Sequence, residues 1–100
     1  MTGIELIAAE RERQVSVEGF SEKEDDAYIN NELALAAYAY VLPEDERPGV
    51  TDSTGKFTPS GWPWGQHWWK PTPDDRIREL VKAGALIAAE IDRLNRKGEA

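Results

Sequence analysis

Residues 72–98 read TPDDRIRELVKAGALIAAEIDRLNRKG, and this stretch decides the fold. Thr72 is a good N-cap and Pro73 suits the first helical position, so we expect a helix to begin here and to end near Gly98. At about 1.5 Å per residue this helix is roughly 35 Å long, enough to span a small domain. Its apolar residues follow spacings of three, four, three, four and three, as in a coiled-coil seam: Ile77, Leu80, Gly84, Ile87, Ile91 and Leu94.

Gly84 lies in the middle of this helix, among alanines. A glycine costs about 1 kcal/mol of helix propensity relative to alanine, which indicates that another backbone approaches closely at this position. The sequence leaves two partners open, the preceding alanine-rich helix or a second copy of the chain. We therefore expect a homo-oligomer whose interface includes Leu80, Gly84, Ile87 and Ile91.

The N-terminal part of the chain predicts two more helices. Thr2 and Glu5 form a capping box, which predicts a helix over about residues 3–17 with a stripe of Ile4, Ile7, Ala8, Arg11 and Val15. A second capping pattern at Ser21 predicts a short helical turn. A stronger helix begins at residue 30 or 31 and ends before Pro43, with one face formed by Leu33, Ala36, Ala37, Tyr40 and Val41.

Residues 43–73 contain all six prolines and four glycines, which disfavours any long regular element. We expect residues 44–60 to form a mobile loop, because they are mainly polar. Residues 61–71 hold all four tryptophans, whose area is too large to leave in water. With 100 residues, the chain is predicted to be a single mainly α-helical domain, a bundle of about three helices with a long Pro/Gly/Trp-rich loop before the last one.

Composition excludes several classes of function. The chain has no cysteine and one histidine, so neither a disulfide framework nor a thiolate or multi-histidine metal site is expected. Residues 1–50 carry 4 Lys/Arg and 12 Asp/Glu, and residues 51–100 carry 8 and 7, which leaves no basic face for duplex nucleic acid. The N-terminus lacks a signal-peptide pattern and no stretch is long enough to cross a bilayer, so we expect a cytoplasmic protein that binds no membrane.

The tryptophans and the cations around them are the candidate ligand site. Planar aromatic rings can stack on a base while nearby cations meet phosphates, which predicts a nucleotide-like anionic ligand bound by Trp62, Trp64, Trp68, Trp69, Lys70, Arg76 and Lys82. The alternative is structural: the tryptophans close one end of a small core, and the cations form a solvated face paired with Asp74.

Acidic residues offer a second candidate site, because hard cations such as Mg²⁺ take carboxylate oxygens. The candidates are Glu22, Glu24, Asp25, Asp26, Glu32, Glu90 and Asp92. Helical nucleotide pyrophosphohydrolases of the MazG kind pair Glu-x-x-Glu with Glu-x-x-Asp, and here only Glu22 to Asp25 has that spacing. Capping and solubility are the alternative explanation for these acids. His67 has no serine or carboxylate placed beside it by a known motif, so no catalytic residue, metal or cofactor is predicted.

Several segments together resemble a group of small phage and prophage proteins encoded in the accessory early regions of lambdoid and related phages. They are Glu10–Gln14, Glu18–Phe20, Asp25-Asp26, Glu32–Ala34, Trp62-Pro63-Trp64, Trp68–Pro71 and Leu80–Ile91. The resemblance covers nearly the whole chain apart from residues 44–60. In that group a tryptophan usually stands where this chain has Phe20, and a histidine where it has Glu24.

The resemblance implies a phage accessory protein, a class that often counters host defence, and several such inhibitors sequester nucleotide messengers without chemistry. Our leading hypothesis is a non-enzymatic, homo-oligomeric anti-defence protein that sequesters a nucleotide-like ligand. The second is an acidic interaction protein that masks a host protein through complementary charge. The third is a Mg²⁺-dependent nucleotide pyrophosphohydrolase, which requires the acids of residues 22–32 and 90–92 to converge.

Overall fold

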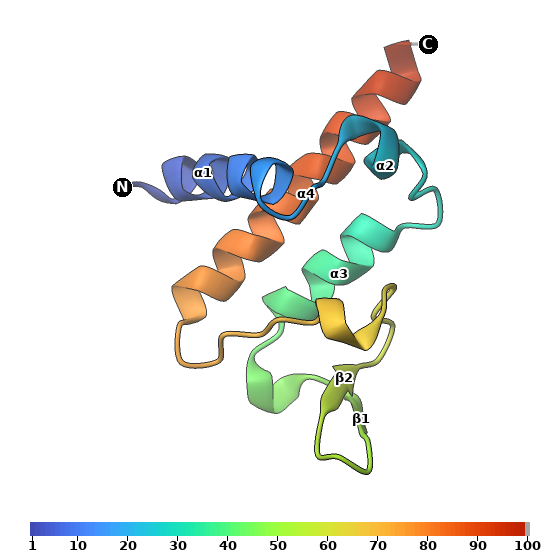
Figure 1. Cartoon of the computed structure of the whole chain (residues 1–100). Coiled ribbons are helices and arrows are strands. Elements are labelled where there is room, and N and C mark those ends of the chain that lie inside the picture. The colour runs from blue at the N-terminus through green and yellow to red at the C-terminus, as the bar shows by residue number, and fades with distance from the viewer. Residues whose placement is uncertain (100) are drawn as a thin grey trace.

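A computed structural model describes residues 1–99, the last of them by its backbone alone, and confirms a mainly α-helical fold. The long helix α4 (Arg76–Glu99) carries the shorter helices α1 (Gly3–Ser16), α2 (Glu22–Asp26) and α3 (Glu32–Val41). In Figure 1, α1 crosses the middle of α4, α3 runs beside its first half, and α2 lies near its end. No helix among these residues is long and apolar enough to cross a membrane.

The start of α4 differs from the prediction. Thr72 and the two residues after it form a turn, in which the Asp75 N–H donates to the Thr72 carbonyl over 2.8 Å. Asp75 is then the residue that caps the helix, since its carboxylate accepts from the Arg78 N–H over 3.0 Å. At the other end the helix continues through Gly98, which was expected to stop it.

Residues 44–60 contain short regular elements that the sequence did not predict. Residues Glu44–Glu46 form a 3₁₀ turn, and β1 (Gly49–Thr51) pairs antiparallel with β2 (Phe57–Pro59), with Val50 opposite Thr58. The Asp52 carboxylate accepts from the Thr54 hydroxyl and from the Lys56 and Thr54 N–H groups, and these hydrogen bonds lower its pKa to about 2 and close the hairpin turn. A second 3₁₀ turn, Gln66–Trp68, follows within the tryptophan-rich segment.

The core lies between α3 and α4 and is closed by an aromatic side chain from the loop. The predicted inner face of α3 is confirmed except for Val41, which is exposed. The core members are Leu33, Ala36, Ala37, Ala39, Tyr40, Trp69, Ala83, Leu86 and Ala89. Most are alanines, so the two helix backbones can approach closely where they pack.

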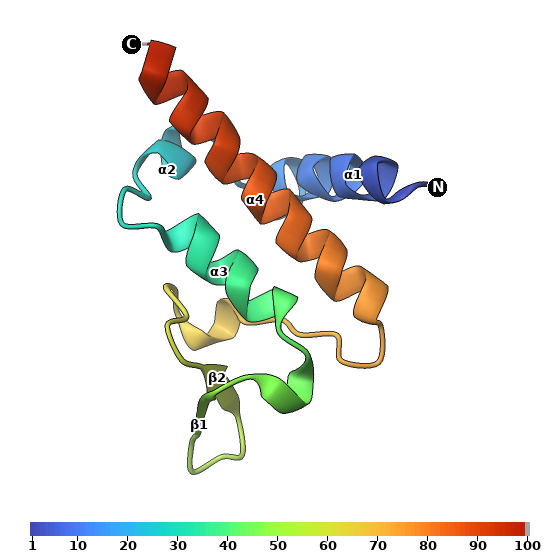
Figure 2. The ribbon, with the colours of Figure 1, turned by 180° about the vertical axis from the view of Figure 1, so that it is seen from behind.

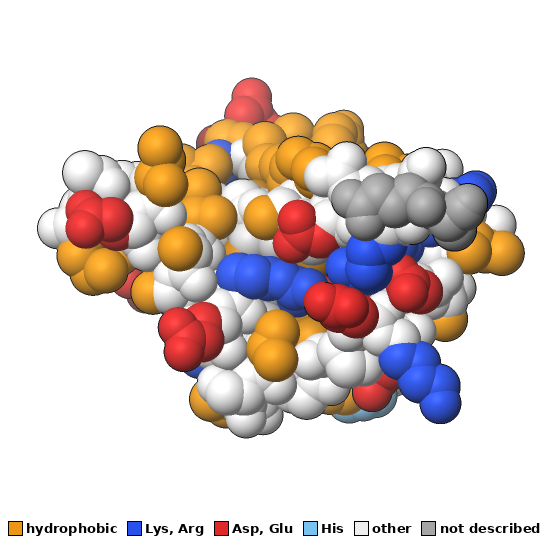
Figure 3. All heavy atoms as spheres, turned by 90° about the horizontal axis from the view of Figure 1, so that it is seen from above, with side chains coloured by type: hydrophobic (Ala, Val, Ile, Leu, Met, Phe, Trp, Pro, Cys, Tyr) orange, Lys and Arg blue, Asp and Glu red, His pale blue; other side chains and the backbone are white. Residues whose placement is uncertain are grey.

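The apolar stripe predicted for α4 is not its buried face, and the stripe predicted for α1 is buried only in part. On α1, Ile4 and Val15 are exposed, Ile7 and Arg11 are half-buried, and the buried residues are Glu10 and Gln14. On α4 the seam itself is exposed, because α3 packs on the opposite side of the helix. In Figure 2, which is turned by 180° from Figure 1, α4 lies in front of the other elements. Figure 3 shows hydrophobic side chains gathered along the upper edge of the molecule.

Gly84 does accommodate a close approach, but its neighbour is neither of the two expected. A Cβ at this position would lie 2.5 Å from Cδ1 of Ile7, so the residue that needs the space is on α1. The prediction that the alanine-rich α3 or a second copy fills this place is corrected. The crossing of α1 over α4 therefore takes place at the glycine, where the missing side chain leaves room for Ile7.

Candidate functional site

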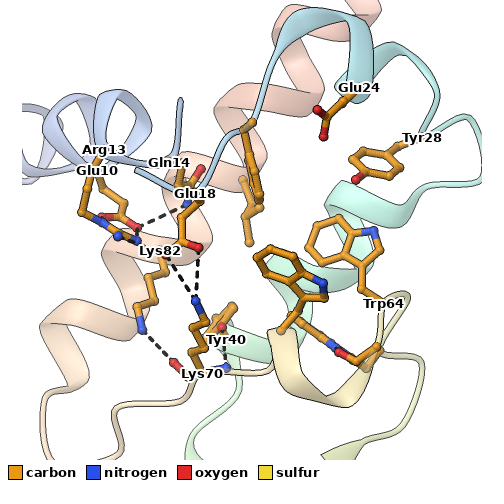
Figure 4. A pocket seen from close by; sticks show the side chains of 15 residues that line it. Glu10, Arg13, Gln14, Glu18, Glu24, Tyr28, Tyr40, Trp64, Lys70 and Lys82 are labelled. Carbon is orange, nitrogen blue, oxygen red and sulfur yellow. Dashed lines mark hydrogen bonds and ion pairs between the residues drawn. The ribbon is translucent and has the colours of Figure 1, made fainter. Parts of the chain in front are cut away.

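Side chains distant in sequence surround one cavity of about 290 Å³, shown in Figure 4. This volume is near the lower end of the range typical of small-molecule sites. Five of the seven residues predicted to bind a ligand line it: Trp62, Trp64, Trp68, Lys70 and Lys82. The fold thus brings the tryptophan-rich segment and α4 together around one space, and α1 supplies a third side.

One side of the cavity is aromatic. The ring of Trp64 lies 5.3 Å from that of Tyr28, and it meets Phe20 and Trp62 in T-shaped contacts at 6.2 and 5.5 Å. Edge-to-face packing of this kind is preferred by aromatic pairs and fixes the orientation of the rings. The sequence prediction missed Phe20 and Tyr28, because they lie in the irregular connections around α2, where no periodic pattern marks them.

The opposite side is polar and consists largely of ion pairs. Nε of Arg13 lies 2.7 Å from the Glu10 carboxylate and its Nη1 lies 3.1 Å from that of Glu18, which also pairs with Lys70 at 3.1 Å. Figure 4 places these groups across the cavity from Tyr28 and Trp64. Burial alone would raise the pKa of both glutamates, but the hydrogen bonds from Arg13 and Lys70 outweigh it, and both pKa values are lowered.

Lys82 is a buried cation in this wall without a carboxylate partner. It is 8% exposed, its Nζ donates to the Lys70 carbonyl over 2.7 Å, and it lies 5.5 Å from the centre of the Tyr40 ring. Among the described residues, no carboxylate is within 4.0 Å of it. Burial and the nearby charge of Arg78 lower the pKa of Lys82. A negative charge bound next to Lys82 would act in the opposite direction and raise this pKa.

Gln14 provides an unsatisfied acceptor beside the cavity. It is 5% exposed, its amide nitrogen donates to Glu10, and its Oε1 has no hydrogen-bond partner among the described residues. A buried acceptor without a donor is costly, and a ligand N–H or an ordered water can satisfy it. The polar wall therefore offers a donor in Lys82 and an acceptor in Gln14.

The remaining two predicted ligand residues have structural roles. Trp69 is buried in the core 4.7 Å from the Tyr40 ring, and Trp62 and Trp64 pack partly buried against the same core, so the structural alternative holds for Trp69 and in part for these two. Arg76 donates to the carbonyls of Tyr40, Val41 and Leu42, which end α3 without helical partners. A guanidinium is well suited to collect several such carbonyls, because its donors form a planar fork.

The acidic residues do not form a metal centre. Asp25 pairs with Arg11 at 2.7 Å, Asp26 with Arg96 at 2.8 Å, and Glu90 with Arg93 at 2.6 Å. Within residues 1–99, no group of three or more His, Asp or Glu side chains is placed so that it could hold a metal ion. A magnesium-dependent hydrolase requires the acids of residues 22–32 and 90–92 to meet at one site, but here Asp25, Asp26 and Glu90 each pair with a different arginine. His67 lies exposed beside the Trp68 ring, 5.3 Å away.

No protein-family model, curated protein or solved structure matches this chain. The geometry of the cavity is therefore the ground for assigning a function.

Proposed function

We propose that this chain is a non-enzymatic phage accessory protein that binds and sequesters a nucleotide-like anionic ligand in the aromatic cavity. The observation that carries the proposal is the junction of two unlike walls, aromatic rings on one side and the unpaired cation Lys82 on the other. A ligand with a planar heterocycle and an anionic group matches these walls, because the heterocycle can lie against the aromatic rings while the anionic group lies at Lys82.

The planar part of the ligand would lie against the aromatic wall. Stacking on an aromatic side chain contributes about 1–3 kcal/mol per base and tolerates different bases, because every base has a π-face. Gln14 also lines the cavity, and its buried Oε1, which has no partner among the described residues, would accept an N–H from such a ring system once the side chain turns toward it. Stacking thus supplies affinity, and the acceptor discriminates among heterocycles.

The anionic part would lie at Lys82. The other two cations of the wall, Arg13 and Lys70, already neutralise Glu10 and Glu18, so they add little net positive charge. No described carboxylate lies within 4.0 Å of Lys82, and burial reduces screening of its charge by water. The cavity lining holds three cations and three carboxylates, Glu24 among them, so its attraction for an anion is local to Lys82 and suits one anionic group rather than a chain of phosphates.

Thermal melting against linear and cyclic nucleotides and adenosine-diphosphate-ribose derivatives tests the proposal, with and without Mg²⁺. A ligand that binds only the folded state raises the melting temperature by mass action, and chromatography should recover it intact. Lys82→Met should lose the shift, while Lys56→Met, an exposed lysine of the hairpin turn, should keep it. A consumed ligand would contradict the non-enzymatic assignment. A panel without any shift would contradict the proposal and favour a host protein as partner.

A further inference from the structure

Five large apolar side chains on α4 face solvent in the single chain, although they repeat at coiled-coil spacing. Ile77 is 67% exposed, and the other four are between 44% and 53% exposed: Leu80, Ile87, Ile91 and Leu94. We call these five residues the α4 seam. An exposed apolar strip of this kind marks an interaction surface.

The spacing of residues along the seam is the same in both directions. Together with Gly84, the spacings of three, four, three, four and three are symmetric about the midpoint between Ala85 and Leu86. A second copy running antiparallel, with its two-fold axis at this midpoint, places Ile77 opposite Leu94 and Leu80 opposite Ile91. It also brings Ile87 to the position of Gly84, where Ile7 of α1 fills the space left by the missing side chain, so Ile87 of one copy would meet Ile7 of the other. Antiparallel pairing thus sets apolar residues of the two copies against one another, as a two-fold interface requires.

The charges at the two ends of α4 favour the same arrangement. Asp74 and Asp75 lie exposed just before the helix begins, and Lys97 lies exposed in its last turns, next to Arg96, which already pairs with Asp26. Antiparallel pairing brings the two aspartates of each copy to Lys97 of the other and opposes the two helix dipoles. Parallel pairing would bring like charges together. The symmetric spacing of the seam and the opposite charges at its two ends point to a second copy rather than to a different protein.

We propose that a second copy of this chain covers the α4 seam and forms an antiparallel two-fold dimer. The proposal gives an orientation and a register to the self-association expected from the sequence. It does not depend on the ligand, because the cavity opens between other elements and is lined by only two residues of α4, Lys82 and Leu86. Failure of either proposal therefore leaves the other testable.

The mass in solution tests the dimer. Light scattering at micromolar concentration should give twice the mass of one chain. Leu80→Glu and Ile91→Glu should each halve it with an unchanged helical circular dichroism spectrum, because both side chains are already largely exposed in the single chain. Val50→Glu, an exposed apolar residue of the hairpin, should remain a dimer. A monomeric wild type, or a dimer that persists in both seam variants, would overturn the proposal.

Disulfide trapping tests the orientation, and the chain suits it because it has no cysteine of its own. Leu80→Cys and Ile91→Cys are prepared separately, one with an affinity tag, then mixed and oxidised. An antiparallel dimer should give the mixed 80–91 disulfide far faster than either variant alone cross-links. Rapid cross-linking of each variant with itself would indicate parallel pairing and overturn the proposed register.

Discussion

The guanidinium of Arg47 lies 2.8 Å from the carboxylate of Glu79, and the two side chains are 2% and 1% exposed. Arg47 also donates to the Ala39 carbonyl over 2.8 Å, and Glu79 accepts from the Thr72 N–H over 3.1 Å. This one ion pair thus joins the end of α3, the 3₁₀ turn at residues 44–46, and the first turns of α4. It fixes the elements on either side of the tryptophan-rich segment in the chain, the 3₁₀ turn before it and α4 after it.

Replacement of Glu79 by alanine should destabilise the protein by about 3–5 kcal/mol, because it leaves the buried Arg47 charge without a partner. The free energy of unfolding measured in urea checks this value. Glu46→Ala, a change at an exposed glutamate of the neighbouring 3₁₀ turn, should stay within about 0.5 kcal/mol of the wild type. Equal losses in the two variants would show that the ion pair does not hold these elements together.

Acid should weaken the contact between α1 and α4. Glu10 accepts from Arg13, lies 2.8 Å from Arg78 of α4, and has a pKa below its ordinary value of 4.5. The folded state therefore binds its proton less tightly than the unfolded state. The stabilisation is fully present above pH 4.5 and is lost as the pH falls through the lowered pKa. Urea midpoints of the wild type and Glu10→Gln, measured from pH 7 downward, should converge below pH 4.5. A constant difference would contradict this linkage.

Truncation of the two adjacent tryptophans should have different effects on stability and on ligand binding. Trp69→Ala removes a buried ring from the core and should cost about 3–5 kcal/mol. Trp68 is 41% exposed and lines the cavity, so Trp68→Ala should cost much less stability and reduce the ligand-induced melting shift. Chemical denaturation measures the loss of stability, and thermal melting with and without the nucleotide measures the loss of binding. A larger stability loss in Trp68→Ala than in Trp69→Ala would show that Trp68, and not Trp69, is the core residue.

Enlarging Gly84 should strain the crossing of α1 over α4. Gly84→Leu places a side chain where Ile7 packs, and overpacking typically costs about 1–3 kcal/mol. Ile7→Ala opens the same space, so the double variant should recover part of the loss. A double-mutant cycle measures this coupling. Additive losses would indicate that the two residues do not share the space.

Local chemistry was sufficient to predict several elements from the sequence. The Thr2–Glu5 capping box forms as expected, with hydrogen bonds of 2.8 and 3.2 Å, and so does the Ser21 cap of α2. The inner face of α3 and the gathering of Trp62, Trp64 and Trp68 near Lys70 were also predicted. These features depend on residues close together in the chain, where spacing and capping determine the conformation.

Only the tertiary structure decided which face of α4 is buried. Periodicity identifies an apolar stripe but not its partner, and α3 packs instead on the face that carries Ala83, Leu86 and Ala89. Alanine permits close approach, and Glu79, Lys82 and Arg93 become buried there because ion pairs and hydrogen bonds satisfy them. Phe20 and Tyr28 line the cavity because they pack on Trp64, a residue distant in the chain, and no local pattern predicts that contact. The sequence alone thus determined the helices and the N-terminal caps of α1 and α2, whereas side-chain complementarity between distant segments determined the core, the cavity and the exposed α4 seam.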